Sequence, residues 1–409
     1  MNTPIGSSIS RRRFIAHTGL GLAAASTISR AIAQGSVANS RIRLGLIGCG
    51  DRSQMIIGPL FKEHGGYEIV ALADYFEDQI KTTVEKLQLT PKRTFTGLQC
   101  AEKMIAAGGL DAVAIISPPY FHPPQARAAV AAGLHVYLAK PVAVDVPGCQ
   151  SIQATGELAR KKGLVFLVDF QTRANDLFIE AIRRVHAGAL GEMCFGEATN
   201  HVDGPPQKAT SGTPEAHLRN WLWDRALSGE MVIEQNIHVI DVMSWAMKEM
   251  PPLRCTGTGG LKGRREFGDT WNHFQLLFEY PNNVGITFSS RQWKMHGTPG
   301  GFLNRMFGTN GVLSTAYGGE VLIRGGVDSF YRGGKTDSLG KFGPGTNIKS
   351  FHSMVHIKDA ANVTLESSVN SNLIAILGRT AARNGRTTTW DEVIRSKERM
   401  EADLSGLHA

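Results

Sequence analysis

Hydrophobic residues follow two different periods along the chain. In the first third, short aliphatic runs such as 42–47, 67–74, 110–116 and 135–139 are separated by helix-length stretches. Strands that alternate with helices predict a parallel sheet. Residues 252–330 instead contain short runs of alternating apolar and polar side chains, as in an antiparallel sheet with one buried face. The pattern predicts an α/β chain with two different sheets.

The first predicted strand ends in a glycine-rich turn, Gly-x-Gly-x-x-Ser at 48–53. The first glycine permits a tight turn and the second lets the backbone approach a pyrophosphate, whereas a serine replaces the third glycine of the dinucleotide-binding fingerprint. The motif alone is weak, because glycine is common at any such turn. Its place between a strand and a helix strengthens it. We expect this turn to bind the cofactor through Gly48, Gly50, Asp51, Arg52 and Ser53.

Asp74 ends the second predicted strand. A carboxylate at this position can accept hydrogen bonds from the ribose hydroxyls of a dinucleotide and would repel a 2′-phosphate. Asp74 therefore favours NAD over NADP, although the residue also suits a helix cap.

Two further polar segments follow predicted strands. The loop from Ser117 to His122 follows one strand, and Lys140 with Pro141 follows the next. Ligands of parallel α/β sheets bind at the carboxyl ends of the strands. We therefore expect Ser117, His122, Lys140 and Pro141 to lie near the cofactor.

Residues 227–247 divide by helical spacing into two faces. Apolar residues form one stripe, whereas Glu234, His238, Asp241 and Trp245 recur on another. An imidazole that titrates near neutrality suits proton transfer during alcohol oxidation. The spacing leaves two alternatives open, namely a buried His238–Asp241 hydrogen bond and a metal site built from Glu234, His238 and Asp241. No further Cys/His cluster supports a metal, so none is predicted.

Together these features resemble the Gfo/Idh/MocA family, which includes glucose-fructose oxidoreductase and inositol dehydrogenase. The likeness rests on the glycine turn, Asp74, "SPPYFHPPQARAAVAAGLHVYLAKPVA", "EQNIHVID" and "ILGRTAARNG". It implies a Rossmann domain followed by an α/β domain with an open, mainly antiparallel sheet that often mediates homo-oligomerisation. It also implies a sugar or cyclitol substrate between the two domains.

The resemblance assigns roles to particular residues. It implies that Lys140 lies near both the nicotinamide and the substrate hydroxyl, and that the Lys140–Pro141 peptide is cis. The family usually has Glu-Lys-Pro here, and Ala139 replaces the glutamate. Without that carboxylate, we expect Lys140 to deprotonate more easily than in Glu-Lys-Pro relatives.

The resemblance likewise makes His238 the acid/base, with Glu234 where the family usually has aspartate and Asp241 as a downstream companion. Arg173 corresponds to a position that often faces the substrate, although a surface arginine would fit equally well. The predicted catalytic residues are thus Lys140, His238 and Glu234, and the predicted substrate residues are Arg173 and Asp241.

The N-terminal segment has the form of a targeting signal. Arg11 and Arg12 precede a weakly apolar run and an Ala-x-Ala site at 31–33, which resembles a twin-arginine signal. The run is too short for a stable membrane anchor. We expect the twin-arginine machinery to export the protein to the periplasm or beyond. The predicted domains are a signal at 1–33, a Rossmann domain at 40–160, a substrate domain at 161–385, and a segment at 386–409 that packs back on the Rossmann side.

The formal charge of +8 does not indicate nucleic-acid binding. Four of these charges are arginines of the first 33 residues, which contain no acid, so the remaining chain carries +4. A nucleic-acid surface requires a clustered basic face.

The leading hypothesis is an exported oxidoreductase that acts on a sugar, cyclitol or glycoside with tightly bound NAD. A retained nucleotide would also allow a redox-neutral glycoside hydrolase or lyase that uses transient oxidation. The Tyr-x-x-His pattern of the family's α-N-acetylgalactosaminidases is absent, which argues against that particular substrate. A non-catalytic sugar-binding protein is the third hypothesis.

Overall fold

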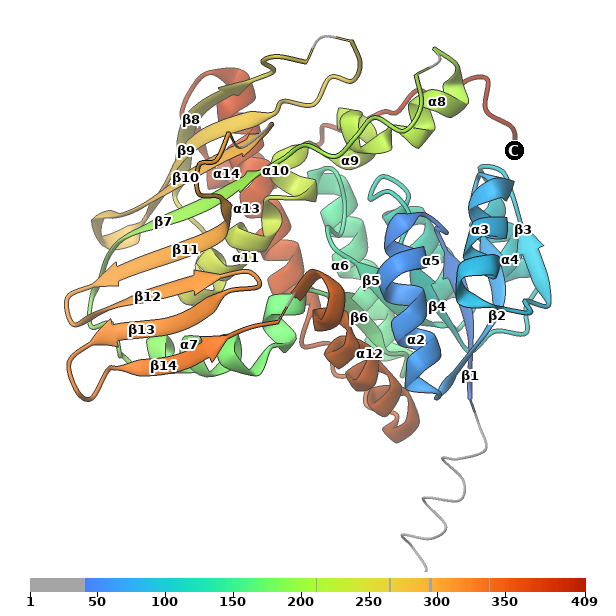
Figure 1. Ribbon diagram of the computed structural model, residues 1–409, viewed down its shortest axis with the longest axis horizontal. Helices are drawn as coiled ribbons and strands as arrows, with labels where there is room; N and C mark the ends of the chain where they lie inside the picture. The colour runs from blue at the N-terminus through green and yellow to red at the C-terminus, as the bar shows by residue number, and fades with distance from the viewer. Residues whose placement is uncertain (1–40, 211, 265, 294–295, 338) are drawn as a thin grey trace, which may run out of the picture. The chain divides into compact units, whose positions relative to one another are not determined.

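The computed structural model describes residues 41–210, 212–264, 266–293, 296–337 and 339–409, and it contains two β-sheets (Figure 1). The predicted twin-arginine signal lies outside the described residues. Residues 42–409 form one compact unit. Among the described residues, no helix has the length and apolar character needed to cross a membrane.

The first sheet has six parallel strands in the order β3-β2-β1-β4-β5-β6. Its central strands are almost wholly buried, as expected of a parallel sheet covered by helices on both faces. The strands are β1 (Ile42–Ile47), β2 (Tyr67–Ala73), β3 (Arg93–Phe95), β4 (Ala112–Ile115), β5 (His135–Ala139) and β6 (Phe166–Asp169). The helices between them are η1 (Ser53–Ile57), α2 (Gly58–His64), α3 (Glu77–Leu87), α4 (Cys100–Ala106), α5 (His122–Ala131) and α6 (Val146–Lys161).

This sheet differs from the expectation at two places. The edge strand β3 was not predicted, because its three residues are too few to show a period. Lys140 therefore follows the fifth strand rather than the fourth. The strand β6 belongs to this sheet, so the Rossmann fold extends past the predicted boundary at residue 160.

The second sheet has nine strands in the order β14-β13-β12-β11-β7-β10-β9-β8-β15. Only β7 and β10 pair in parallel, so the expectation of a mainly antiparallel sheet is confirmed. Its strands are β7 (Met193–Val202), β8 (Arg254–Gly260), β9 (His273–Tyr280), β10 (Val284–Gln292), β11 (Gly301–Gly308), β12 (Gly311–Ala316), β13 (Glu320–Gly325), β14 (Tyr331–Lys335) and β15 (Thr388–Thr389), with the short η4 (Pro281–Asn283) between β9 and β10.

Helices cover one face of the nine-stranded sheet (Figure 1). They include α7 (Asp176–His186), α11 (Ile237–Ala246) and α13 (Leu365–Asn384), while η2 (Gln171–Ala174) precedes α7 and α14 (Trp390–Ile394) follows β15. The helix α13 ends at Gly385, whose φ of 61° is the left-handed conformation that favours glycine after a helix.

The segment 325–345 contains β14, which pairs antiparallel with β13, and the start of α12 (Leu339–Ile357). The helix α12 packs on the Rossmann sheet through the buried Phe351 and through a 2.7 Å hydrogen bond from Tyr67 Oη to Ile348 O.

The predicted helix at 227–247 is broken. The structure has α9 (Arg225–Ser228), α10 (Met231–Glu234) and then α11 after Gln235 and Asn236. Glu234 and His238 therefore lie on different helices, and their spacing does not place them on one helical face. Two short elements precede this region, α8 (Pro214–Arg219) and η3 (Trp221–Trp223).

Candidate functional site

The glycine turn uses its two glycines in different ways. Gly48 has a φ of +87°, and a Cβ there would lie 2.7 Å from the backbone of Ile116 and Ser117, so the fold itself requires glycine. A Cβ on Gly50 would meet no atom within 4 Å. Gly50 thus leaves open space at the cleft wall, which fits the close approach of a pyrophosphate.

Ser53 compensates locally for the missing third glycine. Its buried Oγ donates a 2.5 Å hydrogen bond to Gly48 O, and the helix begins with the π-helical segment η1. The Ser53 side chain therefore links η1 to the glycine turn by a hydrogen bond, where a third glycine would allow close backbone packing.

Asp74 lies where the second strand ends and faces the cleft. Its Oδ2 accepts from Cys49 N at 2.7 Å, and its Oδ1 accepts from Phe76 N at 2.9 Å. Burial raises the pKa of Asp74, whereas these two N–H donors lower it. The carboxylate is not a side-chain cap of α3, so it joins the glycine turn to the next loop and remains in position for a ribose.

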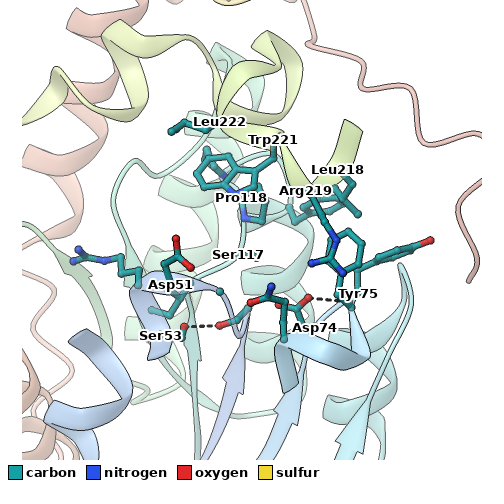
Figure 2. Close-up of a pocket in the computed structure, with 18 of the residues that line it drawn as sticks. Asp51, Ser53, Asp74, Tyr75, Ser117, Pro118, Leu218, Arg219, Trp221 and Leu222 are labelled. Carbon is teal, nitrogen blue, oxygen red and sulfur yellow. Dashed lines mark hydrogen bonds between the residues drawn. The ribbon is translucent and has the colours of Figure 1, made fainter. Parts of the chain in front are cut away.

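A cleft of about 350 Å³ runs along the strand ends (Figure 2). From the Rossmann side it is lined by the predicted residues Gly48, Gly50, Asp51, Arg52, Ser53, Asp74, Ser117, Lys140 and Pro141. Leu218, Trp221 and Leu222 lie on the opposite side of the pocket from Ser53 and Asp74 (Figure 2). These three residues were not predicted as cofactor contacts, since nothing in the local sequence pattern connects them with the strand ends.

Lys140 lies in the cleft next to Glu234. The Lys140–Pro141 peptide is cis, as the resemblance implied. Lys140 Nζ lies 3.0 Å from Glu234 Oε1 and 2.5 Å from Glu234 O, and the two side chains are 7% and 18% exposed. The idea that Ala139 leaves Lys140 without a carboxylate is therefore wrong. Burial lowers the pKa of Lys140, and the Glu234 charge opposes that shift.

Arg52 reaches from the glycine turn to a residue that the sequence did not single out. Its Nη2 donates to Asp169 Oδ2 at 3.0 Å, and Asp169 is fully buried at the end of β6. Asn347 and Gln171 donate to the same carboxylate at 2.8 and 3.2 Å. The strand-end rule that indicated Lys140 applies equally to Asp169.

His122 does not line the cleft. Its Nδ1 lies 2.9 Å from Pro141 O and its Nε2 lies 2.8 Å from Ser117 O, so the side chain joins two strand-end loops. Burial lowers the pKa of His122 to about 4. We therefore interpret it as a residue that positions the loops, instead of the cofactor contact that was predicted.

His238, the predicted acid/base, does not line the cleft and is enclosed by aromatic rings. Phe302 stacks on the imidazole with centroids 5.9 Å apart, and Tyr317 and Phe170 lie at 5.0 and 6.4 Å. Its Nδ1 is buried and makes no hydrogen bond within the described part of the chain. Burial, followed by the charges of Lys140 and Arg52, lowers the pKa of His238 well below its usual value.

Arg173 and Asp241 form a buried ion pair. The guanidinium lies 2.8 Å from Asp241 Oδ1, contacts Glu249 at 2.8 Å, and lies over the Trp245 ring. Asp241 also accepts from Ser371 at 2.8 Å. Neither residue lines the cleft, so the arrangement does not support the predicted substrate contact. Asp241 does not pair with His238, and the described residues contain no group of three or more metal-ligating side chains placed to hold an ion.

Comparison with known proteins agrees with this geometry. The family profile described as "Oxidoreductase family, NAD-binding Rossmann fold" matches residues 42–170, and the profile "GFO/IDH/MocA C-terminal domain" matches residues 178–314. The chain belongs to the Gfo/Idh/MocA oxidoreductase family. Its first sheet is the NAD-binding Rossmann fold of that family. The cleft lining fits the cofactor, because Gly50 leaves open space and the Asp74 carboxylate lies beside it.

Curated relatives of the family are distant. A myo-inositol dehydrogenase from Streptomyces leeuwenhoekii is 26% identical over 204 residues, which cover 49% of this chain and 54% of that protein. A glycosyl hydrolase family 109 protein from Saccharopolyspora erythraea is 24% identical over 294 residues, which cover 68% of this chain and 63% of that protein. This Gfo/Idh/MocA chain thus spans about half the length of several curated relatives that it matches.

Solved structures share the fold over a larger part of the chain. The scyllo-inositol dehydrogenase from Lactobacillus casei aligns with a TM-score of 0.65 at 18% identity, over 86% of this chain and 99% of that one. A levoglucosan dehydrogenase in complex with NADH and levoglucosan aligns with a TM-score of 0.67 at 16% identity, over 86% and 99% of the two chains. At these identities the likeness shows the fold alone.

Proposed function

We propose that this protein is an NAD-dependent oxidoreductase that acts on a hydroxyl group of a sugar, cyclitol or glycoside. The observation that carries the proposal is the Lys140–Glu234 pair, which lies in the same cleft as the glycine turn and Asp74. The substrate class is supported by the inositol dehydrogenases among the curated relatives.

Bound NAD would accept or return a hydride at the substrate carbon. An alcohol that loses hydride must also lose its hydroxyl proton, so a positioned base is required. Lys140 provides an amine whose pKa burial lowers. His238 does not line the cleft and is buried among aromatic rings, so it is given no contact with the substrate. In this scheme Glu234 holds Lys140 Nζ, and Lys140 takes the hydroxyl proton.

A redox-neutral glycoside hydrolase or lyase is the second candidate. It is favoured by the match to family 109 glycosyl hydrolases, one of which aligns with 68% of this chain. Oxidation of one hydroxyl to a ketone acidifies the neighbouring C–H, which permits elimination of the glycosidic oxygen. In a hydrolase water would then add to the unsaturated ketone, whereas in a lyase it would not, and return of the hydride to the ketone would leave no net NADH.

Mass spectrometry of the native protein for retained nucleotide tests both candidates. Retained NAD, or NAD binding on addition, is expected. Absence of both would contradict the two enzymatic proposals and favour a non-catalytic sugar-binding protein. A screen of cyclitols, sugars and glycosides then separates the candidates, because NADH accumulation indicates a dehydrogenase and cleavage without NADH indicates the redox-neutral enzyme.

We also propose that residues 1–33 direct export through the twin-arginine machinery, on the sequence pattern alone. Cell fractionation of the protein and of an Arg11→Lys/Arg12→Lys variant tests this, and the variant should remain in the cytoplasm. Equal amounts of the two proteins in the periplasm would contradict it.

We further propose that the protein is a homo-oligomer. Support comes from the outer face of the nine-stranded sheet, where Phe195 and Leu303 are 46% and 39% exposed and the rings of Phe195 and Phe307 stack at 4.4 Å. Light scattering on a size-exclusion column should give a mass above that of one chain, and Phe195→Asp should lower it. A monomeric mass for the native protein would contradict the proposal.

A further inference from the structure

The roof of the cleft comes from outside the Rossmann fold. We define the roof as Pro205, Pro206, Lys208 and residues 218–223, all of which line the cleft. These residues follow β7 in the chain, yet they lie over the strand ends that carry Asp74 and Ser117 (Figure 2).

Two cations attach the roof to the nucleotide-binding half. Lys208 forms an ion pair with Asp51 of the glycine turn. Arg219 Nη2 lies 2.6 Å from Asp78 Oδ1, and the guanidinium lies 3.9 Å from the centroid of the Phe76 ring. Asp51 lines the cleft, and Asp78 lies on α3 next to the lining residue Gln79. Ion pairs this exposed contribute little stability individually. They alone would not hold the roof firmly over the cleft.

The C-terminal segment, residues 396–409, supplies a second attachment. Leu98 N donates to His408 O at 3.1 Å, and His408 N donates to Tyr75 Oη at 3.3 Å. The rings of Tyr75 and His408 are 4.4 Å apart. Tyr75 and Leu98 both line the cleft on the Asp74 side, so the last residues of the chain cover its adenosine end from outside.

One apolar cluster joins the three parts. The buried Leu218 of the roof and Tyr75 of the Rossmann fold pack in the same cluster as the C-terminal residues Ala402, Leu404 and Leu407. Apolar burial stabilises such a cluster in proportion to its buried area, and salt does not screen it as it screens the two ion pairs.

We propose that the roof and the C-terminal segment form a clasp that retains the dinucleotide, so that NAD leaves only when the apolar cluster opens. The inference rests on the proposed nucleotide binding in this cleft. It goes beyond that proposal because it states that residues outside the Rossmann fold slow the dissociation of the nucleotide. A retained nucleotide is what a redox-neutral cycle requires, since the hydride returns to the same substrate.

Dissociation of NADH from the full chain tests the clasp. NADH fluorescence is followed while excess NAD⁺ displaces it, for the native protein and for a deletion of residues 402–409. The deletion should raise the dissociation rate at least tenfold with a smaller change in the association rate. Leu404→Ser/Leu407→Ser should act in the same direction, and Arg219→Gln should raise the rate about threefold at low salt and less at high salt, because salt screens the ion pair.

Leu253→Ser is the matched control, because Leu253 is 57% exposed and lies outside the cluster. Its dissociation rate should equal that of the native protein. If the deleted chain does not fold, the point variants decide the question. Unchanged dissociation rates in Leu404→Ser/Leu407→Ser and Arg219→Gln would overturn the clasp. Failure of the native protein to bind NADH would instead overturn the proposed nucleotide site.

Discussion

Two buried ion pairs near α10 and α11 differ in their surroundings. Lys140 and Glu234 lie at the cleft wall, and both keep some exposure. Arg173 and Asp241 lie behind the wall, where the carboxylate is fully buried and also accepts from Ser371. The first pair leaves capacity for a ligand, whereas the second is satisfied within the protein.

The same division applies to the glycines and histidines of the site. Gly50 opens into the cleft, whereas Gly48 is packed against a backbone. His122, which does not line the cleft, lies between two loop carbonyls, and its neutral imidazole donates to one of them. Residue type is therefore a poor guide to role here, and the contacts that each side chain or glycine makes are a better one.

The largest loss of stability is expected when the buried Arg173–Asp241 ion pair is broken. Arg173→Met leaves the Asp241 carboxylate buried without its cation, which typically lowers the free energy of unfolding by about 3–5 kcal/mol. Urea denaturation measures it. The double variant Arg173→Met/Asp241→Leu should recover part of the loss, because a matched apolar pair removes the unpaired charge. A loss below about 1 kcal/mol in the single variant would contradict the structural role.

Replacing Gly48 should mainly lower the stability of the protein, whereas replacing Gly50 should mainly weaken NAD binding. Gly48→Ala forces a side chain into a positive-φ position against backbone atoms, so we expect a loss of about 1–3 kcal/mol in the free energy of unfolding. Gly50→Ala should keep the stability and weaken NAD binding at least tenfold. Thermal unfolding and NADH titration check the pair, and equal effects of the two variants on stability would argue against the division.

His122 should make stability depend on pH. Its pKa is about 4 in the folded protein and about 6.5 when unfolded, so the unfolded state binds the proton first as pH falls. Stability from this residue is present above pH 6.5 and is lost between pH 6.5 and 4, by about 2 kcal/mol between pH 7 and 5. His122→Gln should reduce the acid sensitivity by that amount in denaturation curves. Parallel pH profiles would exclude the effect.

The smallest effect on stability is expected when Lys140, which lines the cleft, is replaced. Lys140→Met removes a buried charge whose partner Glu234 retains contact with the cleft, so we expect a change of about 1 kcal/mol in the free energy of unfolding. Activity on the substrate that the screen identifies should fall by about 10²-fold or more. A variant that is fully active would remove Lys140 from the mechanism.

Local patterns predicted the parts of the fold that follow from local physics. The glycine turn and the strands that precede Asp74 and Lys140 depend on neighbours in the chain. Prediction failed where an element was very short, as at β3, or where a helix was interrupted, as between Glu234 and Ile237. A hydrophobic period can be recognised only over several residues of one regular element, and these segments are too short or are interrupted.

Sequence by itself predicted the two kinds of sheet and most residues at the strand ends, because each follows from spacing along the chain, and its motifs carried the resemblance to the family. Only the tertiary structure decided that Glu234 is the carboxylate beside Lys140, that Asp241 belongs to Arg173 instead of His238, and that the C-terminal residues cover Tyr75. These are contacts between residues about 70 to more than 300 positions apart, and no local period encodes which distant side chain fills a given space.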